Sequence, residues 1–166
     1  MLSTPSPVDE AKALRRTYGC FPSGVVALCA LGADGEPIGM AASSFTTVSL
    51  DPPLVAVCIQ ETSTTWPRLK ARERIGLSIL AEDHEDACRA LSRKGGDRFD
   101  SVYWDSTAEG VVFVHGSPAW FDCIIEKEVT AGDHAIVLFR ICGARTDTEV
   151  EPLVFHGSRF RPLAAG

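Results

Sequence analysis

GMAASSFTTVSLDPPLV, residues 39–55, is the stretch that says most about the fold and the candidate site. Small and hydroxylated residues gather at 41–44, where we expect a strand to end, and Asp51-Pro52-Pro53 marks a turn or a sheet edge because proline cannot donate to a sheet. Side chains without bulk let a flat ligand lie against the backbone, and hydroxyls and free amides bind phosphate or carbonyl oxygens. The same residue types also cap turns without any ligand, so the stretch alone leaves both interpretations open.

Short apolar segments separated by turn residues surround this stretch and predict strands. Val25 to Leu31 and Ile38 to Ser44 form a hairpin around Asp34-Gly35. Other strands are expected at 54–59, 74–80, 119–129 (its alternation broken only at Lys127), 134–141, 153–156 and 159–160. Short helices are expected at 7–18, after 62–65, and from a cap at Asp83 through residue 91, with a long loop at 93–110. Since barrel closure removes bare sheet edges, we predict a mainly β, antiparallel barrel, closed or nearly closed, with a few short helices.

Length and charge bound the class of protein. One domain, residues 1–166, fits the chain length, and 45% apolar with 23% charged residues is typical of a globular protein. Sixteen basic and 22 acidic residues give a net charge of −6, which argues against non-specific binding to nucleic acid or to an anionic membrane. Because Met1 to Glu10 lacks a signal-peptide layout and no apolar run is long enough to span a membrane, we expect a cytoplasmic protein.

Six cysteines raise the question of disulfides or a metal site. Cys29, Cys58, Cys123 and Cys142 lie in apolar runs, where reduced thiols are expected to be buried. No pair has CxxC spacing and no histidine follows at zinc-finger distance. We therefore expect six free thiols, a reducing compartment and no metal.

A second hydroxylated cluster is Gln60-Glu61-Thr62-Ser63-Thr64-Thr65-Trp66. Its hydroxyls and the start of a helix can receive a phosphate, or they can simply cap that helix. Because both clusters flank the strand at 54–59, we expect them on one rim of the barrel.

A third feature is Gly132-Asp133-His134, in which the Asp-His pair suggests acid–base chemistry or an ordinary hairpin turn. The chain has no Gly-x-Ser-x-Gly elbow, no GxGxxG and no GxxxxGK[ST], so hydrolase, Rossmann and P-loop interpretations have no support. The pairs Asp86/Arg89 and Arg72/Glu73 are predicted to be solvated.

Taken together, these motifs resemble the flavin reductase family. The resemblance is carried by FPSGV at 21–25, GMAASSF at 39–45, VSLDPPLV at 48–55, STTW at 63–66, GDH at 132–134 and PLVF at 152–155, and it covers about 14–163. It implies the split-barrel FMN-binding fold, and NAD(P)H-dependent reduction of flavin for a partner monooxygenase. It further implies a homodimer with the flavin near the subunit interface.

The resemblance also implies a site. His134 is expected to face the nicotinamide ring of NADH or NADPH, and to orient its amide or stabilise charge. Contacts with the flavin, FMN or FAD, are expected from three segments: Ser23, Gly24, Val25, Ala41, Ala42, Ser43, Ser44, Phe45, Thr47, Thr62, Ser63, Thr64 and Trp66. Phe155 lies in a region that matches a pyridine-nucleotide contact. Ala41-Ala42 departs from the family, where many members carry a hydroxylated pair.

Two points stay open at this level. The loop Arg93-Lys94-Gly95-Gly96-Asp97-Arg98-Phe99 is either a phosphate contact or nicotinamide lid, through Arg93, Lys94 and Arg98, or a solvated loop. The alternatives to a flavin reductase are a flavin-binding module or electron carrier without turnover, and an oxidase of another small substrate.

Overall fold

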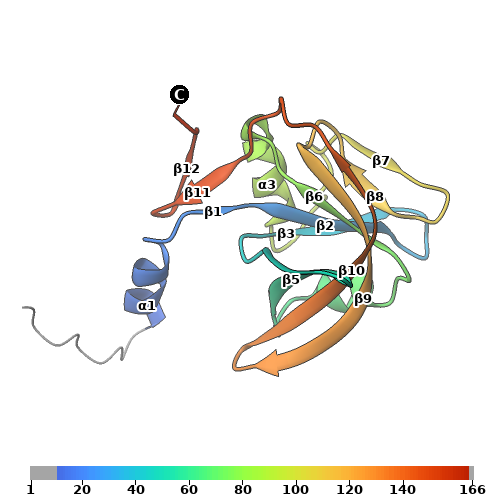
Figure 1. Cartoon of the computed structure of the whole chain (residues 1–166), viewed down its shortest axis with the longest axis horizontal. Coiled ribbons are helices and arrows are strands. Elements are labelled where there is room, and N and C mark those ends of the chain that lie inside the picture. Colours follow the sequence, from blue (N-terminus) through green and yellow to red (C-terminus); the bar gives the residue numbers. More distant parts are fainter. Residues whose placement is uncertain (1–10, 165–166) are drawn as a thin grey trace, which may run out of the picture.

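The computed structural model describes residues 11–164, most of them in antiparallel strands (Figure 1). The largest sheet has the strand order β3-β2-β6-β9-β10-β5-β4, while β1-β11-β12 and β7-β8 form two small sheets. The strands are β1 Ser23–Gly24, β2 Val26–Leu31, β3 Pro37–Ala42, β4 Thr46–Leu50, β5 Pro53–Gln60, β6 Ile75–Ile79, β7 Trp104–Ser106, β8 Val112–Val114, β9 Ala119–Ala131, β10 His134–Thr146, β11 Val154–His156 and β12 Arg159–Arg161.

Strand β2 is buried on both faces, which explains its continuous apolar sequence. Val26 and Leu28 belong to the core enclosed by the large sheet. Ala27 and Cys29 belong to a second core, which packs under helix α3 (Glu85–Leu91). The predicted hairpin is confirmed, since β2 pairs with β3 from Val26 opposite Ala42 to Leu31 opposite Pro37.

The predicted class, mainly β and antiparallel with few short helices, is confirmed. In the described part of the chain β3 and β4 end the sheet order, and no backbone pairing joins them. A side chain between these two strands bonds β5 instead. The Ser44 hydroxyl donates to the Cys58 carbonyl on β5 at 2.9 Å and accepts from the Cys58 amide at 3.0 Å. The segment between β3 and β4 is thereby fixed to the neighbouring strand.

The helices are α1 (Ala11–Tyr18), α2 (Trp66–Lys70), the short 3₁₀ turn η1 (Glu82–His84) and α3. The predicted first helix is confirmed from Ala11, and its residues 7–10 lie outside the described range. The predicted cap at Asp83 is wrong: η1 precedes α3, and the His84 Nδ1 accepts the amide of Ala81 at 3.0 Å. The 3₁₀ turn η1 therefore leads directly into α3, which has no side-chain cap at its start.

One local departure from the predictions and one local agreement remain. The predicted loop at 93–110 contains β7, which pairs with β8. The break in alternation predicted at Lys127 coincides with a bulge, because Leu138 pairs with Lys127 whereas Phe139 pairs with Ile125.

All six cysteines are free, as predicted. Cys29 and Cys123 are buried, and burial raises the pKa of each thiol to about 12. Cys58 and Cys142, predicted to be buried, are exposed because they lie on outward-facing positions of β5 and β10. The apolar runs of β5 and β10 predict strands covered on both faces, whereas each of these strands is exposed on one face at the cysteine. No helix within residues 11–164 is long and apolar enough to cross a membrane.

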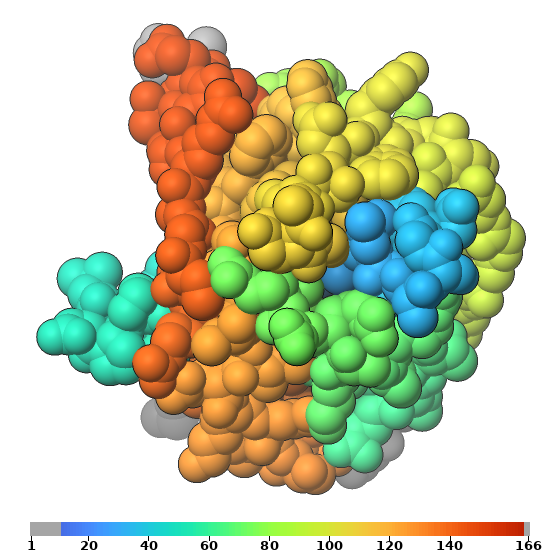
Figure 2. Space-filling model, turned by 90° about the vertical axis from the view of Figure 1, so that its right-hand side faces the viewer, coloured from blue at the N-terminus to red at the C-terminus, as the bar shows by residue number. Residues whose placement is uncertain are grey.

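Two parts project from the main body. Helix α1 and the β1-β11-β12 sheet stand off to one side (Figure 1), and Figure 2 shows the β4–β5 turn extending separately. Leu50 at that turn is 96% exposed. The space between the projecting sheet and the body contains the main cavity.

Candidate functional site

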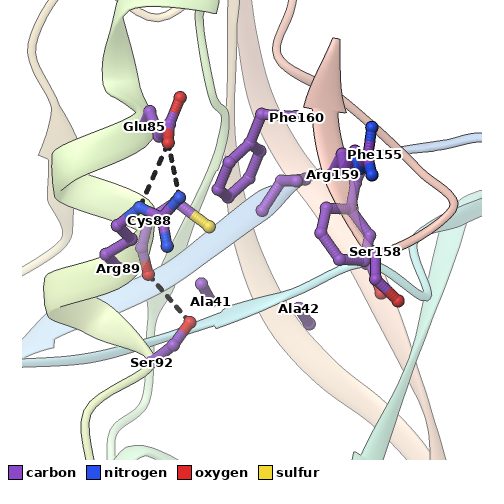
Figure 3. A pocket seen from close by; sticks show the side chains of 12 residues that line it. Ala41, Ala42, Glu85, Cys88, Arg89, Ser92, Phe155, Ser158, Arg159 and Phe160 are labelled. Atoms are coloured by element: carbon purple, nitrogen blue, oxygen red, sulfur yellow. Dashed lines mark hydrogen bonds and ion pairs between the residues drawn. The ribbon is translucent and has the colours of Figure 1, made fainter.

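The main cavity has a volume of about 630 Å³ and lies between α3, the end of β3 and the β11–β12 hairpin (Figure 3). Five of the predicted site residues line it: Val25, Ala41, Ala42, Ser43 and Phe155. They come from three segments that are distant in sequence. The structure therefore brings four of the predicted flavin contacts together with Phe155, the predicted pyridine-nucleotide contact.

Strand pairing places these residues. Val25 follows β1, in which Ser23 pairs with Phe155 and Gly24 with Val154, so both β1 residues border the cavity without lining it. The Phe155 and Phe160 rings lie 5.4 Å apart and form an aromatic wall. The floor at 41–43 carries only methyl and hydroxymethyl side chains. The cavity thus has a flat, unobstructed floor and an aromatic side.

The other wall contains residues that were not predicted. Arg89 is solvent-exposed, as predicted, and it also lines the cavity, where its Nε and Nη2 donate to Glu85 Oε1 at 3.1 and 2.6 Å. Glu85 raises the pKa of this guanidinium, whose carbon lies 5.1 Å from the centre of the Phe160 ring. Burial raises the pKa of the Cys88 thiol on the same wall, which keeps it neutral. The other unpredicted lining residues are Ser92, Ser158 and Arg159.

Sequence offered a weak signal for this wall. Residues 85, 88, 89 and 92 lie three or four apart and so share one face of a helix. That spacing does not show which segment the face meets. The C-terminal hairpin, which forms the opposite side, is about 70 residues further along the chain.

The next predicted contacts lie beside the cavity. The Ser44 hydroxyl is hydrogen-bonded to the backbone of Cys58, whereas the Ser43 hydroxyl has no hydrogen bond to another residue in the described part of the chain. Phe45 stacks on Phe121, with ring centres 5.9 Å apart, and packs against the core. Thr47 is exposed on β4, away from the lining. Ser43 is thus the hydroxyl that the cavity floor presents.

The second hydroxylated cluster mainly builds the start of α2. The Ser63 hydroxyl accepts the amide of Trp66, the first residue of α2, at 3.1 Å. This hydrogen bond agrees with the interpretation in which the hydroxyls of this cluster cap the helix. Trp66, predicted to contact flavin, is only 6% exposed and packs edge-on against Phe139, so it serves the core. Thr62 and Thr64 remain exposed.

A second cavity of about 270 Å³ adjoins Thr64. Arg68, Lys94 and Arg98 line it, together with Gly95 and Gly96 and the start of β3. Two cations of the predicted anion-binding loop therefore face a hollow.

The third cation of that loop does not. Arg93 instead pairs with Asp100 at 2.9 Å. Arg98 donates to the carbonyl oxygens of Gly39 and Leu91, and burial, followed by the charge of Arg68, lowers its pKa.

His134 begins β10 and lines neither cavity. Its Nδ1 lies 2.7 Å from Asp133 Oδ1, and this hydrogen bond lowers the pKa of the Asp133 carboxyl. The Asp133 carbonyl accepts the Glu61 amide at 3.0 Å, and His134 pairs with Gln60. The structure thus brings His134 to the second hydroxylated cluster, apart from the floor at 41–43.

Comparison with known proteins gives a consistent picture. Residues 18–164 match the family model described as a flavin reductase-like domain. The chain is 38% identical to an NADH-dependent FAD reductase of Streptomyces globisporus, over 95% of this chain and 88% of that protein. It is 32% identical to a flavin reductase of Pseudomonas putida, over 91% and 89%.

Structural comparison agrees. The NADH:FAD oxidoreductase of Streptomyces globisporus C-1027, solved with NAD and FAD fragments, superposes with a TM-score of 0.87 at 36% identity and covers 96% of this chain and 98% of that one. Some relatives are longer: the chain spans 51% of a probable flavin reductase of Rhizobium meliloti that is 35% identical over 96% of this chain.

Proposed function

The chain belongs to the flavin reductase-like domain family, and on that premise we propose that it is an NAD(P)H:flavin oxidoreductase. It reduces FMN or FAD with NADH or NADPH and supplies the reduced flavin to a separate monooxygenase. The observation that carries this proposal is the convergence of Val25, residues 41–43 and Phe155 on one cavity. A single cavity thereby unites two segments that the family resemblance links to flavin with one that it links to the pyridine nucleotide.

The residues present fit a flavin. Ala41 and Ala42 leave the floor open to a planar ring, and Ser43 offers a free hydroxyl to its polar edge. Phe155 supplies an aromatic surface on which a second planar ring can lie. The alanine pair lacks the hydroxyls that many relatives carry, so Ser43 and backbone amides provide the polar contacts in this chain.

When bound, the flavin would supply the acceptor for the hydride, a proton with two electrons, that a dihydronicotinamide donates. The protein's own residues position the reactants. Residues 41–43 and the aromatic wall hold the two rings in register and exclude water from between them. His134 lines neither cavity of a single chain, so its proposed role, to stabilise negative charge or orient the nicotinamide amide with Asp133 holding its Nδ1, depends on the subunit interface proposed below.

We also propose a homodimer. Val48, Val129 and Ile136 are exposed apolar side chains on β4, β9 and β10, and exposed Cys58 lies opposite Ile136. Alternate residues of a strand share a face, so His134 lies on the same outward face as Ile136. A second copy covering this face would shield His134 and place it at a site near the interface. Six free thiols support a cytoplasmic location.

Anaerobic mixing of the protein with flavin and NADH or NADPH tests the activity. Loss of the visible absorbance of oxidised flavin within a catalytic time is expected. Flavin binding without bleaching would indicate a flavin carrier, and hydrogen peroxide formed from another substrate without nicotinamide would indicate an oxidase. Equilibrium sedimentation tests the dimer, because a monomer at micromolar concentration would contradict it.

A further inference from the structure

His84 lies directly before α3, and its imidazole is held on two sides. Nδ1 accepts the amide of Ala81 at 3.0 Å, and the side chain is only 14% exposed. The imidazole is also hydrogen-bonded to the His115 backbone, and a Cβ at Gly116 would lie 3.6 Å from Nε2. A ring nitrogen that accepts a hydrogen bond carries no proton, so this arrangement requires a neutral imidazole.

The amide that the imidazole binds belongs to a segment where three parts of the chain meet. The Leu80 amide donates to the Val25 carbonyl at 2.9 Å, and the Leu80 carbonyl accepts the Leu153 amide at 2.8 Å. The next residue, Ala81, forms a β-bridge with Pro152. Residues 80 and 81 are therefore bonded to segments on both sides of them.

Each of these parts of the chain supplies a wall of the main cavity. Val25 lines the cavity directly, Phe155 lines it two residues beyond Leu153, and α3 begins immediately after His84 (Figure 3). Ala81 is only 2% exposed, so water is a poor substitute for the imidazole as partner of its amide. The hydrogen bond from Ala81 to His84 thus fixes the start of α3 relative to the other two walls.

We propose that His84 is a positioning residue for flavin binding: its neutral imidazole holds α3 against the other walls of the main cavity, and its protonation releases that helix. This inference rests on the proposed function, in which a flavin occupies the cavity. His84 does not line the cavity, so it acts through α3, whose Glu85, Cys88 and Arg89 do. A protonated Nδ1 would turn a donor toward the Ala81 amide, and two donors cannot bond each other.

The groups around His84 determine when it protonates. Burial is the largest influence and lowers the pKa of His84 below its ordinary value of 6.5. Asp83, whose Oδ1 lies 3.8 Å from Nε2, raises this pKa, and the like charge of His115 lowers it. The other carboxylates of the neighbouring segments are exposed or paired with Arg89: Glu82, Glu151 and Glu85. The imidazole is therefore neutral at pH 7 and becomes charged only in mild acid.

Two substitutions separate the hydrogen bond from the charge. His84→Asn keeps a side-chain oxygen that can accept the Ala81 amide and does not titrate in this range, whereas His84→Ala removes the acceptor. His115→Asn is the matched control, because His115 is exposed and does not line the main cavity. The measurements are calorimetric Kd values from about pH 8 to pH 5, and amide hydrogen exchange of residues 80–92 without flavin. Both FMN and riboflavin are titrated, because the phosphate of FMN itself titrates near pH 6.

At about pH 7.5 we expect His84→Asn to bind riboflavin within about twofold of the parent, and His84→Ala to bind it about tenfold more weakly, the effect of one lost hydrogen bond. Between about pH 7 and pH 5 the Kd of the parent should rise about threefold or more, because the cavity with a protonated His84 binds flavin less well. His115→Asn should keep this rise, and His84→Asn should lose it.

Several results would overturn the inference. A parent-like rise in His84→Asn would assign the pH dependence to another group, such as His134 or His156. Parent-like affinity in His84→Ala at about pH 7.5 would show that the hydrogen bond does not position the wall. If His84→Ala fails to fold, the comparison of His84→Asn with the parent across the pH range decides.

Failure of the proposed function has a different signature. A parent that binds neither flavin at about pH 7.5 refutes the flavin site. Hydrogen exchange then decides the role of His84, because it requires no ligand. Faster exchange of α3 in His84→Ala, restored to the parent rate in His84→Asn, supports the positioning of the wall, and equal exchange in all three proteins contradicts it.

Discussion

Ser43 on the cavity floor and its neighbour Ser44 are the same residue type with different roles, and replacing each with alanine separates the roles. Ser44→Ala removes a hydroxyl that donates to the Cys58 carbonyl at 2.9 Å and accepts the Cys58 amide at 3.0 Å. A neutral hydrogen bond contributes about 1 kcal/mol net. Because Cys58 is exposed and water can replace the lost partner, we expect a loss of about 1–2 kcal/mol in the free energy of unfolding.

That loss is measurable in a chain of this size. At about 2–4 °C per kcal/mol, the Tm of Ser44→Ala should fall by about 2–8 °C. Ser43→Ala should leave the free energy of unfolding within about 0.5 kcal/mol of the parent, because its hydroxyl has no partner among residues 11–164. It should instead weaken flavin binding by about two- to tenfold, the cost of one neutral hydrogen bond.

Urea unfolding followed by tryptophan fluorescence, with flavin titration by calorimetry, measures both quantities. If Ser44→Ala is as stable as the parent, or if Ser43→Ala is destabilised as much as Ser44→Ala, the two serines do not have the different roles proposed for them. An unchanged flavin affinity in Ser43→Ala would show that the Ser43 hydroxyl does not contact the flavin.

Three other substitutions test the remaining features. His134→Ala should slow flavin reduction about tenfold or more in stopped-flow absorbance while flavin affinity changes less than about twofold, because the imidazole is proposed to act on the nicotinamide. Gly76→Ala should cost about 3 kcal/mol or more in urea unfolding, or prevent folding, because a Cβ there would lie 2.1 Å from the Val112 carbonyl oxygen. Burial lowers the pKa of His84, so the folded state binds fewer protons than the unfolded state, and the unfolding free energy should fall as pH drops below about 6.5. His84→Gln should flatten that dependence, because glutamine does not titrate in this range.

Each of these has its own control. An unchanged hydride-transfer rate in His134→Ala would end the proposed role of that imidazole. Gly95→Ala adds the same methyl group where nothing lies within 4 Å and should cost under about 1 kcal/mol; equal losses at both glycines would contradict the steric argument. For His84, an NMR-determined pKa at or above the ordinary value would contradict the burial argument.

Sequence located eight of the twelve strands because their signals are local, whereas β1, β4, β7 and β8 were not predicted. Asp34-Gly35 and Gly132-Asp133 each join two apolar runs, and hairpins form at both places. The antiparallel class follows from such short connections. Similarly, the small residues at 41–43 pointed to the cavity floor because their chemistry is local, whereas Phe155 of the aromatic wall was indicated only by the family resemblance of the motif at 152–155.

The tertiary structure decided which face of each element is covered, and that cannot be inferred from alternation alone. Cys58 faces outward although its strand is apolar, and Trp66 enters the core although it follows a hydroxylated cluster. Ser44 bonds a neighbouring strand while Ser43 faces the cavity. Glu85 and Arg89 became cavity residues only because α3 packs opposite a hairpin far along the chain. Periodicity shows that a segment has two faces, whereas the partner of each face is set by contacts between distant segments.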